Sequence, residues 1–154
     1  MEEDFINLVE NNQGLIHKIC RLYGDNEEDR NDLFQEILLQ LWKAYPGYSG
    51  KAKISTWMYR IALYTAMADL KKRKRRIQHL KIKNTELNSA DLNFDLEHVQ
   101  AGISLLNAGD KALLALYIDD KPYQEIAEII GITENNVGVR LNRIKKKLRE
   151  SIKV

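Results

Sequence analysis

The sequence predicts an all-α protein made of two small helical domains, joined by a flexible linker, with a helix-turn-helix in the C-terminal domain. Apolar residues recur at a spacing near 3.6, there is no convincing alternating strand pattern, and the chain has only two prolines. Over residues 77–100 this periodicity weakens and polar turn-forming residues accumulate. A length of 154 residues fits two small domains. We therefore expect domains at 1–76 and 101–154 and a linker at 77–100.

The first helical segment runs from about Phe5 to Tyr23. The polar and glycine-containing stretch at residues 11–14 is expected to interrupt it, and Gly24 is expected to end it.

The next helix is the most clearly signalled. Asp25 or Asn26 can cap it, and acidic residues fill its first turn, where they suit the helix dipole. Pro46 and Gly47 end it. Its predicted apolar stripe is Leu33, Phe34, Ile37, Leu38, Leu41, Trp42 and Tyr45. Leu39 lies off this stripe among polar residues, either as an ordinary exposed leucine or as an apolar anchor for a protein partner.

A third helix is predicted after the loop at residues 48–53, with Ser55 as its cap and the basic run at 71–76 at its end. Its predicted apolar side is Trp57, Met58, Ile61, Ala62 and Thr65. Aromatic rings mixed with cations are suited to single-stranded DNA, because bases stack on the rings while cations follow the phosphates. The alternative is that the aromatic residues are core and the cations are solvated.

Residues 123–148 carry the most specific local pattern, that of a helix-turn-helix. It follows a helix that Asp110 can cap and that carries Leu113, Leu114, Leu116 and Tyr117. Ile126, Ala127 and Ile130 are expected to be buried in the first helix, Gly131 to adopt a positive φ, Ile132 to enter the core, and Thr133 to cap the second helix. Val137, Leu141, Ile144 and Leu148 form the inner stripe of that second helix. An ordinary helical hairpin with an amphipathic last helix is the alternative.

The second helix would present its N-terminal residues to base edges in the major groove, where asparagine pairs with adenine and arginine with guanine or phosphate. The lysines at 145–147 are better placed for phosphates. Charged residues make up 30% of the chain, but the net charge is only +2, so the basic clusters at 71–76 and 140–153 indicate local contact with a polyanion.

Other classes of function find little support. Cys20 is the only cysteine, which excludes an intrachain disulfide. His17 and Cys20 could share a helix face, but two ligands are too few for a closed zinc site, and we expect no metal and no cofactor. There is no phosphate-cradling glycine loop and no convincing nucleophile–base pair, so we expect no enzyme. Lacking a signal peptide or an apolar stretch of membrane length, the protein is expected to be cytoplasmic, without membrane insertion.

Three motifs in order resemble the sigma-70 family, specifically its small extracytoplasmic-function (ECF) group. DLFQEILLQLW at 32–42 looks like the polymerase-binding helix, YSGKAKISTWMYRIALYTA at 48–66 like the segment that melts and reads the −10 element, and residues 123–148 like the reader of the −35 element. The resemblance implies a bacterial sigma factor that binds core RNA polymerase, recognises both promoter elements and promotes DNA melting, while polymerase does the chemistry. It also implies an anti-sigma factor as a partner. Residues 1–76 would then be sigma region 2, and residues 101–154 sigma region 4.

The resemblance assigns residues to three surfaces. The polymerase-binding residues are Asp32, Gln35, Glu36, Leu39 and Trp42. The −10 DNA-binding residues, which would also hold the melted non-template strand, are Tyr48, Lys51, Lys53, Trp57, Tyr59, Arg60, Tyr64, Lys71 and Lys72. The −35 DNA-binding residues, which would hold double-stranded promoter DNA, are Thr133, Asn135, Asn136, Gly138, Val139, Arg140, Asn142, Arg143 and Lys146.

The chain departs from the family pattern at two places. Tyr64 stands where the family often has asparagine, and Ala68 where it has aspartate, with Asp69 one step displaced. Gly138 and Val139 replace a common lysine–serine or lysine–threonine pair. Both departures affect how a promoter would be read. A stand-alone helix-turn-helix regulator remains the rival reading, although it leaves the residues at 32–42 without a role.

Overall fold

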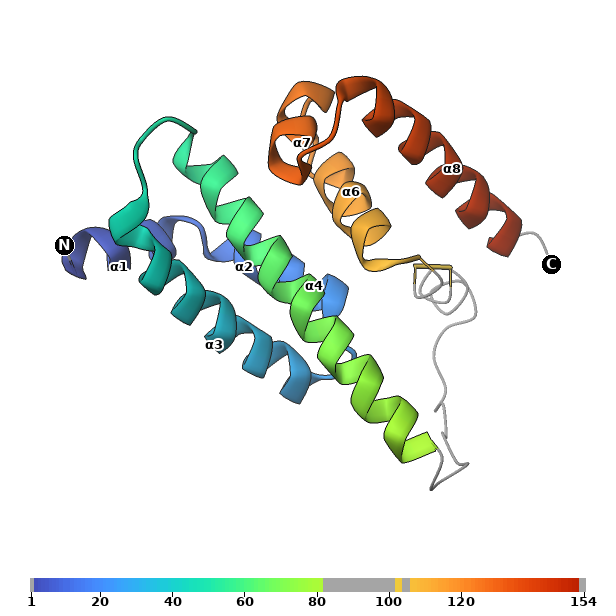
Figure 1. Cartoon of the computed structure of the whole chain (residues 1–154), viewed down its shortest axis with the longest axis horizontal. Coiled ribbons are helices and arrows are strands. Elements are labelled where there is room, and N and C mark those ends of the chain that lie inside the picture. Colours follow the sequence, from blue (N-terminus) through green and yellow to red (C-terminus); the bar gives the residue numbers. More distant parts are fainter. Residues whose placement is uncertain (1, 82–101, 104–105, 153–154) are drawn as a thin grey trace. The chain divides into compact units, whose positions relative to one another are not determined.

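A computed structural model of the chain describes residues 2–81, 102–103 and 106–152. The regular secondary structure of these residues is helical throughout (Figure 1), which confirms the all-α prediction. The chain divides into two compact units, and the first boundary along the sequence falls after Lys71. The helices of each unit are described separately below. Residues 82–100 of the predicted linker lie outside the described residues, whereas residues 77–81 are still helical.

In the first unit, α1 (Glu2–Asn11) and α2 (Gln13–Tyr23) meet at Asn12, where the interruption was predicted. The Asn12 side chain donates a hydrogen bond to the carbonyl oxygen of Leu8 (2.8 Å). Helix α1 has no buried residue. Helix α2 contributes to the core through Ile16, Ile19, Cys20 and Tyr23.

Gly24 ends α2 as predicted, but for a different reason than a left-handed turn. Its φ is −88°, a conformation open to any residue. A Cβ at this position would lie 2.5 Å from Cγ of Arg30 and 2.8 Å from the carbonyl oxygen of Cys20. The glycine is therefore required by the close approach of the chain to Arg30, whose Nε donates to the Gly24 carbonyl oxygen (3.3 Å).

Helix α3 (Glu27–Ala44) packs against α2 and is capped by Asn26, one of the two predicted candidates. The Asn26 Oδ1 accepts a hydrogen bond from the backbone N–H of Asp29 (2.8 Å). The fully buried part of the predicted stripe is Leu33, Ile37 and Leu41, while Trp42 is 44% exposed. A short 3₁₀ helix, η1 (Tyr45–Gly47), contains Pro46 and follows α3 directly.

Helix α4 (Ile54–Lys81) begins earlier and ends later than predicted. Ser55 lies inside its first turn and is not its cap; the backbone N–H of Trp57 already donates to the carbonyl oxygen of Lys53 (3.1 Å). The buried side also differs from the predicted one. It consists of Thr56, Met58, Tyr59, Ala62, Leu63, Ala66 and Leu70. This stripe is rotated from the predicted one by about one residue, or about 100°.

The second unit contains α6 (Ala108–Ile118), α7 (Tyr123–Ile130) as far as Ala127, and α8 (Glu134–Ile152), with α6 packed against α8, while residues 128–131 are grouped with the first unit. The cap of α6 is Asn107 rather than Asp110, because the Asn107 Oδ1 accepts from the backbone N–H of Asp110 (2.8 Å). The core of the second unit includes Leu113, Leu116, Ile126, Val137, Leu141 and Ile144. The predicted core residues Ile130, Ile132 and Leu148 are only partly buried.

The turn between α7 and α8 follows the prediction closely. Gly131 has a φ of +84°, in the left-handed region that favours glycine. The N–H of Ile132 donates to the carbonyl oxygen of Ala127 (3.1 Å), and Thr133 Oγ1 accepts from the N–H of Asn136 (3.2 Å). These contacts satisfy backbone groups at both helix ends. The helix-turn-helix is therefore present.

Candidate functional site

The outer face of α3 combines polar side chains with one apolar side chain. Asp32, Gln35, Glu36 and Leu39 are all exposed, and Leu39 is 44% exposed. With about 100° per residue, this face lies opposite the buried stripe of α3. The Gln40 amide donates to a carboxylate oxygen of Glu36 (2.9 Å), which orders one edge of the face. The arrangement suits a protein partner that covers an apolar anchor within a polar rim.

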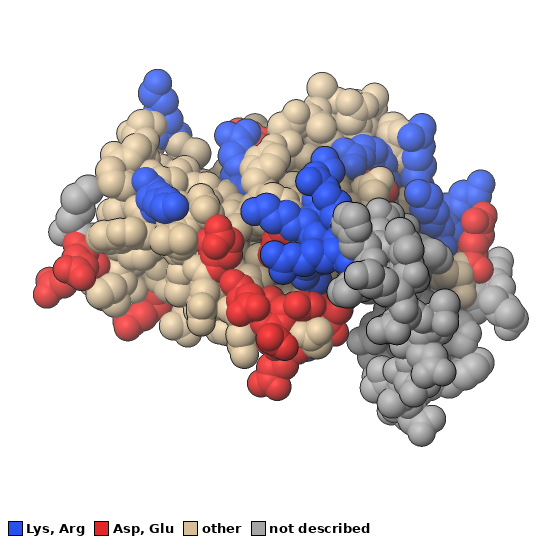
Figure 2. Space-filling view, turned by 60° about the horizontal axis from the view of Figure 1, so that its bottom comes forward, with Lys and Arg blue, Asp and Glu red and all other residues tan. Residues whose placement is uncertain are grey.

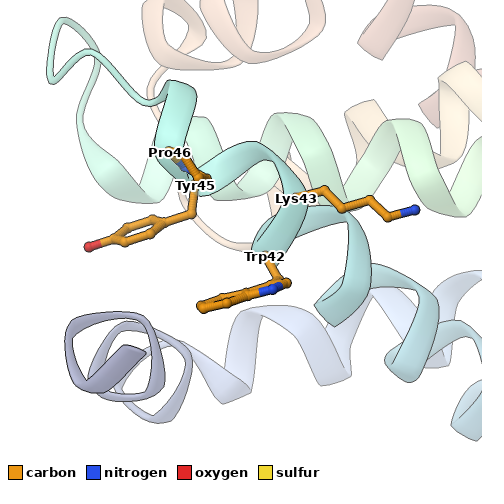
Figure 3. A pocket seen from close by; sticks show the side chains of 4 residues that line it. All are labelled: Trp42, Lys43, Tyr45 and Pro46. Carbon is orange, nitrogen blue, oxygen red and sulfur yellow. The ribbon is translucent and has the colours of Figure 1, made fainter. Parts of the chain in front are cut away.

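Trp42, at the end of the same helix, is held by aromatic neighbours. Its ring meets Phe5 of α1 edge-on with centroids 5.0 Å apart, and Phe5 lies 5.5 Å from the Tyr45 ring. Figure 3 shows Trp42 and Tyr45 beside a hollow that Lys43 and Pro46 complete. Phe5 was predicted only as a helix residue. A single aromatic residue next to three acidic ones was the only sign in the sequence that Phe5 packs against other rings.

The loop before α4 is folded onto the start of that helix by aromatic contacts. The Trp57 ring lies 5.1 Å from Tyr48 and 6.3 Å from Tyr45, measured between centroids. The Tyr48 hydroxyl donates a hydrogen bond to the carbonyl oxygen of Ala52. Lys51 is exposed in the loop, as is Lys53. Trp57 itself is only half-buried, so part of its side chain remains accessible.

An exposed face continues along α4. Trp57, Tyr64 and Lys71 are seven residues apart, a spacing that keeps them within about 40° of one direction. Tyr64 is 51% exposed, and Arg60 and Lys72 are also exposed. The space-filling view shows a group of basic side chains next to a group of acidic ones, with further charged side chains elsewhere on the same side of the molecule (Figure 2). The exposed part of α4 therefore carries two aromatic rings with Arg60 between them, followed by Lys71 and Lys72.

Tyr59 does not belong to this face, although it was predicted to bind DNA there. Its side chain is only 3% exposed and lies with the buried residues of α4. It is two residues from Trp57, which turns it about 200° around the helix. Tyr59 is therefore a core residue, and its ring is not available for stacking with a base.

The exposed face of α8 contains most of the residues that were predicted for major-groove contact. Its buried side is Val137, Leu141 and Ile144. Thr133 is exposed at the cap of α8. The exposed predicted residues of the helix itself are Asn135, Asn136, Val139, Asn142, Arg143 and Lys146. Amide, guanidinium and ammonium groups on one helical face suit base edges and phosphates in the major groove.

Arg140 and Gly138 take part in the packing of the second unit itself. The Arg140 guanidinium lies 3.1 Å from Oδ1 of Asp110 in the first turn of α6. An added Cβ at Gly138 would lie 3.6 Å from the Tyr123 ring. The Arg140 side chain therefore has an internal partner, where the sequence predicted a contact with DNA. Sequence spacing gave no signal for an ion pair across thirty residues.

Among the described residues, no three potential metal ligands lie close enough together to hold an ion. Cys20 is buried, and burial raises the pKa of its thiol to about 11, with a further contribution from the negative charge of Asp69. His17 is exposed and stacks on Phe34 with centroids 4.7 Å apart. No helix in the described part of the chain is long and apolar enough to cross a membrane.

Two family models match the chain: sigma-70 region 2 over residues 8–76 and sigma-70 region 4 over residues 97–148. The ECF RNA polymerase sigma factor SigG of Mycobacterium tuberculosis is 50% identical over 57 residues, which are 37% of this chain and 15% of SigG. This chain thus spans a small part of SigG. The RNA polymerase sigma factor SigV of Bacillus subtilis is 25% identical, with 87% of this chain and 82% of SigV covered.

Solved structures agree with the fold. The sigma factor RpoE of Bartonella quintana, in complex with the anti-sigma factor NepR, matches with a TM-score of 0.76 at 18% identity and covers 99% of this chain and 98% of its own. CnrH, in complex with the cytosolic domain of CnrY, matches with a TM-score of 0.72 at 21% identity and covers 97% of this chain and 88% of its own.

Proposed function

Since the chain belongs to the sigma-70 family of transcription initiation factors, within its ECF group, we propose that it binds core RNA polymerase, recognises −35 and −10 promoter elements and promotes DNA melting. The observation that carries the proposal is the exposed face of α8, which is opposite the buried Val137, Leu141 and Ile144. Residues 1–76 would act as the polymerase- and −10-binding domain, and residues 101–154 as the −35-binding domain.

The α3 face would bind core polymerase. Leu39 supplies an exposed apolar side chain, surrounded by Asp32, Gln35 and Glu36. Trp42 supplies a second apolar contact because its ring is fixed by Phe5 yet remains 44% exposed. Tryptophan is among the residues that most often dominate the binding energy of protein interfaces.

The face of α4 would capture bases of the opened strand. Bases can stack on the half-buried ring of Trp57 and on the exposed ring of Tyr64. Stacking would favour the melted state, because paired bases inside a duplex are not accessible to these rings. Lys71 and Lys72 would contact phosphates, which hold the protein in register without reading sequence.

In vitro transcription tests the whole proposal. Core polymerase and genomic fragments should give start sites only when this protein is added. Leu39→Glu should abolish binding to core polymerase because it places a charge in the centre of the docking surface. Ile118→Glu is the matched control, since Ile118 is 68% exposed on α6 of the other unit. A complete absence of protein-dependent start sites would overturn the proposal.

Melting can be tested separately from binding. Trp57→Ala and Tyr64→Ala should reduce permanganate reactivity of unpaired thymines on a duplex promoter. A promoter with a pre-formed bubble should restore transcription by these variants, because no pairs remain to be opened. If the bubble template gave no recovery, the two rings would have another role.

A stand-alone helix-turn-helix regulator would instead bind promoter DNA and form no complex with core polymerase.

An anti-sigma factor is the expected regulator. The complex of RpoE with NepR shows that a protein of this fold can be held by such a partner. A partner that covers the α3 face would block Leu39 and Trp42. Competition between core polymerase and that partner for this chain would test the idea, with simultaneous binding of both arguing against it.

A further inference from the structure

Val139 occupies an unusual place for an apolar side chain. It is 42% exposed on α8. The buried residues Val137, Leu141 and Ile144 lie about 140–200° from it around the helix. Val139 therefore lies at the centre of the exposed face, on the side of the helix away from the core.

The neighbours of Val139 on this face are polar and carry no carboxylate. Asn135 and Arg143 are four residues away on either side, so their side chains flank it on one surface. Glu134, the acidic residue in the first turn of α8, lies about 140° away around the helix. Among the described residues of this face from 135 to 146, the sequence offers amide, guanidinium and ammonium groups but no carboxylate, the usual acceptor for the amino group of cytosine.

An aliphatic side chain in a major groove has one apolar partner among the base edges, the C5-methyl group of thymine. Valine suits this contact because its branched side chain has one strongly preferred rotamer in a helix. Its methyl groups are therefore held in place before DNA binds. Ala127 and Ile129, by comparison, are apolar residues of the helix-turn-helix that are buried.

We propose that Val139 is a specificity-determining residue that selects thymine at one position of the −35 element by contact with its methyl group. This inference rests on the proposed function, because it requires α8 to lie in the major groove. Asn135 and Arg143 would contact base edges or phosphates on either side, so the selected thymine would lie within the segment that they cover.

The size of the effect follows from the area of one methyl group. Burial of one carbon of this kind is worth about 0.8 kcal/mol, which corresponds to about a fourfold change in the dissociation constant. Replacement of thymine by uracil removes only this methyl group and leaves base pairing intact. Affinity for DNA should therefore fall about fourfold at the selected position and much less at other thymines.

The experiment uses the full chain with core polymerase and a duplex library randomised over the −35 segment. Duplexes enriched by the wild-type complex are resynthesised with deoxyuridine in place of each thymidine in turn, and their dissociation constants are measured. One position should show the fourfold loss with wild-type protein. Val139→Ala should bring the thymine-to-uracil ratio at that position close to one, whereas Val139→Ile should preserve it. Asn135→Ala is the matched control and should weaken binding without changing that ratio.

Two results would overturn the inference. One is a ratio close to one at every position with wild-type protein. The other is an unchanged ratio with Val139→Ala. If no sequence is enriched at all, the proposed function fails first and the role of Val139 fails with it. Enrichment of a sequence without thymine in the segment would overturn the role of Val139 alone.

Discussion

The ion pair between Arg140 and Asp110 permits a direct test of whether Arg140 stabilises the fold. The two charged groups are 3.1 Å apart, and their side chains are 31% and 12% exposed. Hydrogen bonds to charged groups contribute about 1.5–3 kcal/mol, while exposed ion pairs contribute less than about 1 kcal/mol. Because Arg140 is nearly one-third exposed, we expect Arg140→Ala to lower the free energy of unfolding by about 1–2 kcal/mol.

The matched control is Arg143→Ala, which removes the same side chain from the exposed face of the same helix. It should leave the free energy of unfolding unchanged and weaken promoter binding. Urea unfolding followed by circular dichroism gives the stability difference. Amide hydrogen exchange in α6 and α8 assigns it to the second unit, since local protection reports local opening.

A double-mutant cycle with Asp110→Asn isolates the interaction between the two charges. We expect a coupling energy of about 1 kcal/mol between the two side chains. Equal stability of Arg140→Ala and Arg143→Ala, or a coupling energy near zero, would refute the reasoning. Arg140 would then be available for DNA, as the sequence alone suggested.

Four further predictions concern single features. Gly138→Ala should raise the free energy of unfolding by about 0.5–1 kcal/mol, because the position is inside a helix and an added Cβ would have ordinary contact distances. Gly24→Ala should lower the free energy of unfolding, because a Cβ there would lie 2.5 Å from Arg30. Chemical denaturation should therefore show changes of opposite sign for the two variants, and changes of the same sign would contradict the packing. Thr133→Ala should lower the free energy of unfolding by about 1 kcal/mol through loss of the α8 cap, while Thr133→Ser should leave it unchanged. An equal loss of stability in both variants would exclude capping as the cause. Burial of Cys20 raises the pKa of its thiol from 9.0 to about 11. The stability that the buried neutral thiol provides should therefore be fully present below pH 9 and be lost as the pH rises through 11. Thiol alkylation of the folded chain at pH 8 should be slow, and rapid alkylation without unfolding would contradict this. Promoter binding by the complex of this protein with core polymerase should weaken steeply as the salt concentration rises, and the dependence on salt should be shallower for Lys71→Ala. An affinity that does not change with salt in filter binding would count against phosphate contacts.

Local chemistry made the helix-turn-helix predictable. Gly131, Thr133 and Val137 each have a role that is set within a few residues: a left-handed turn, a side-chain cap and an inward position on the next helix. The same holds for Asn26, although two neighbouring residues were equally plausible caps. The resemblance to the family then supplied the order of surfaces, and exposure of the predicted α3 face is compatible with it.

The orientation of α4 was harder to predict because apolar residues occur on several of its sides. Trp57 and Tyr59 are both aromatic, and the sequence does not show which of them faces the core. The structure buries Tyr59 with Met58 and Leu63 and leaves Trp57 partly open. Packing with the other helices of the unit decided the rotation, and a single-helix pattern carries no information about it.

Contacts between distant residues were also beyond local reasoning. Asp110 resembled a helix cap, but Asn107 takes that position and leaves Asp110 in the first turn, where it meets Arg140. Phe5 was similarly ambiguous until the structure showed its contacts with Trp42 and Tyr45. In both cases the partner lies more than twenty-five residues away in the sequence, and only the tertiary fold identifies it.

The uninterrupted course of α4 has a consequence for promoter geometry. Trp57 and Lys71 lie on one rigid element, and their separation along its axis is about 21 Å at 1.5 Å per residue. This length corresponds to about six base pairs at 3.4 Å per nucleotide of one strand. In the proposed complex, the boundary between opened and paired DNA would thus keep a constant distance from the anchoring phosphates. One inserted residue between the two positions would lengthen this distance by about 1.5 Å, but would also turn the cation about 100° away from the DNA.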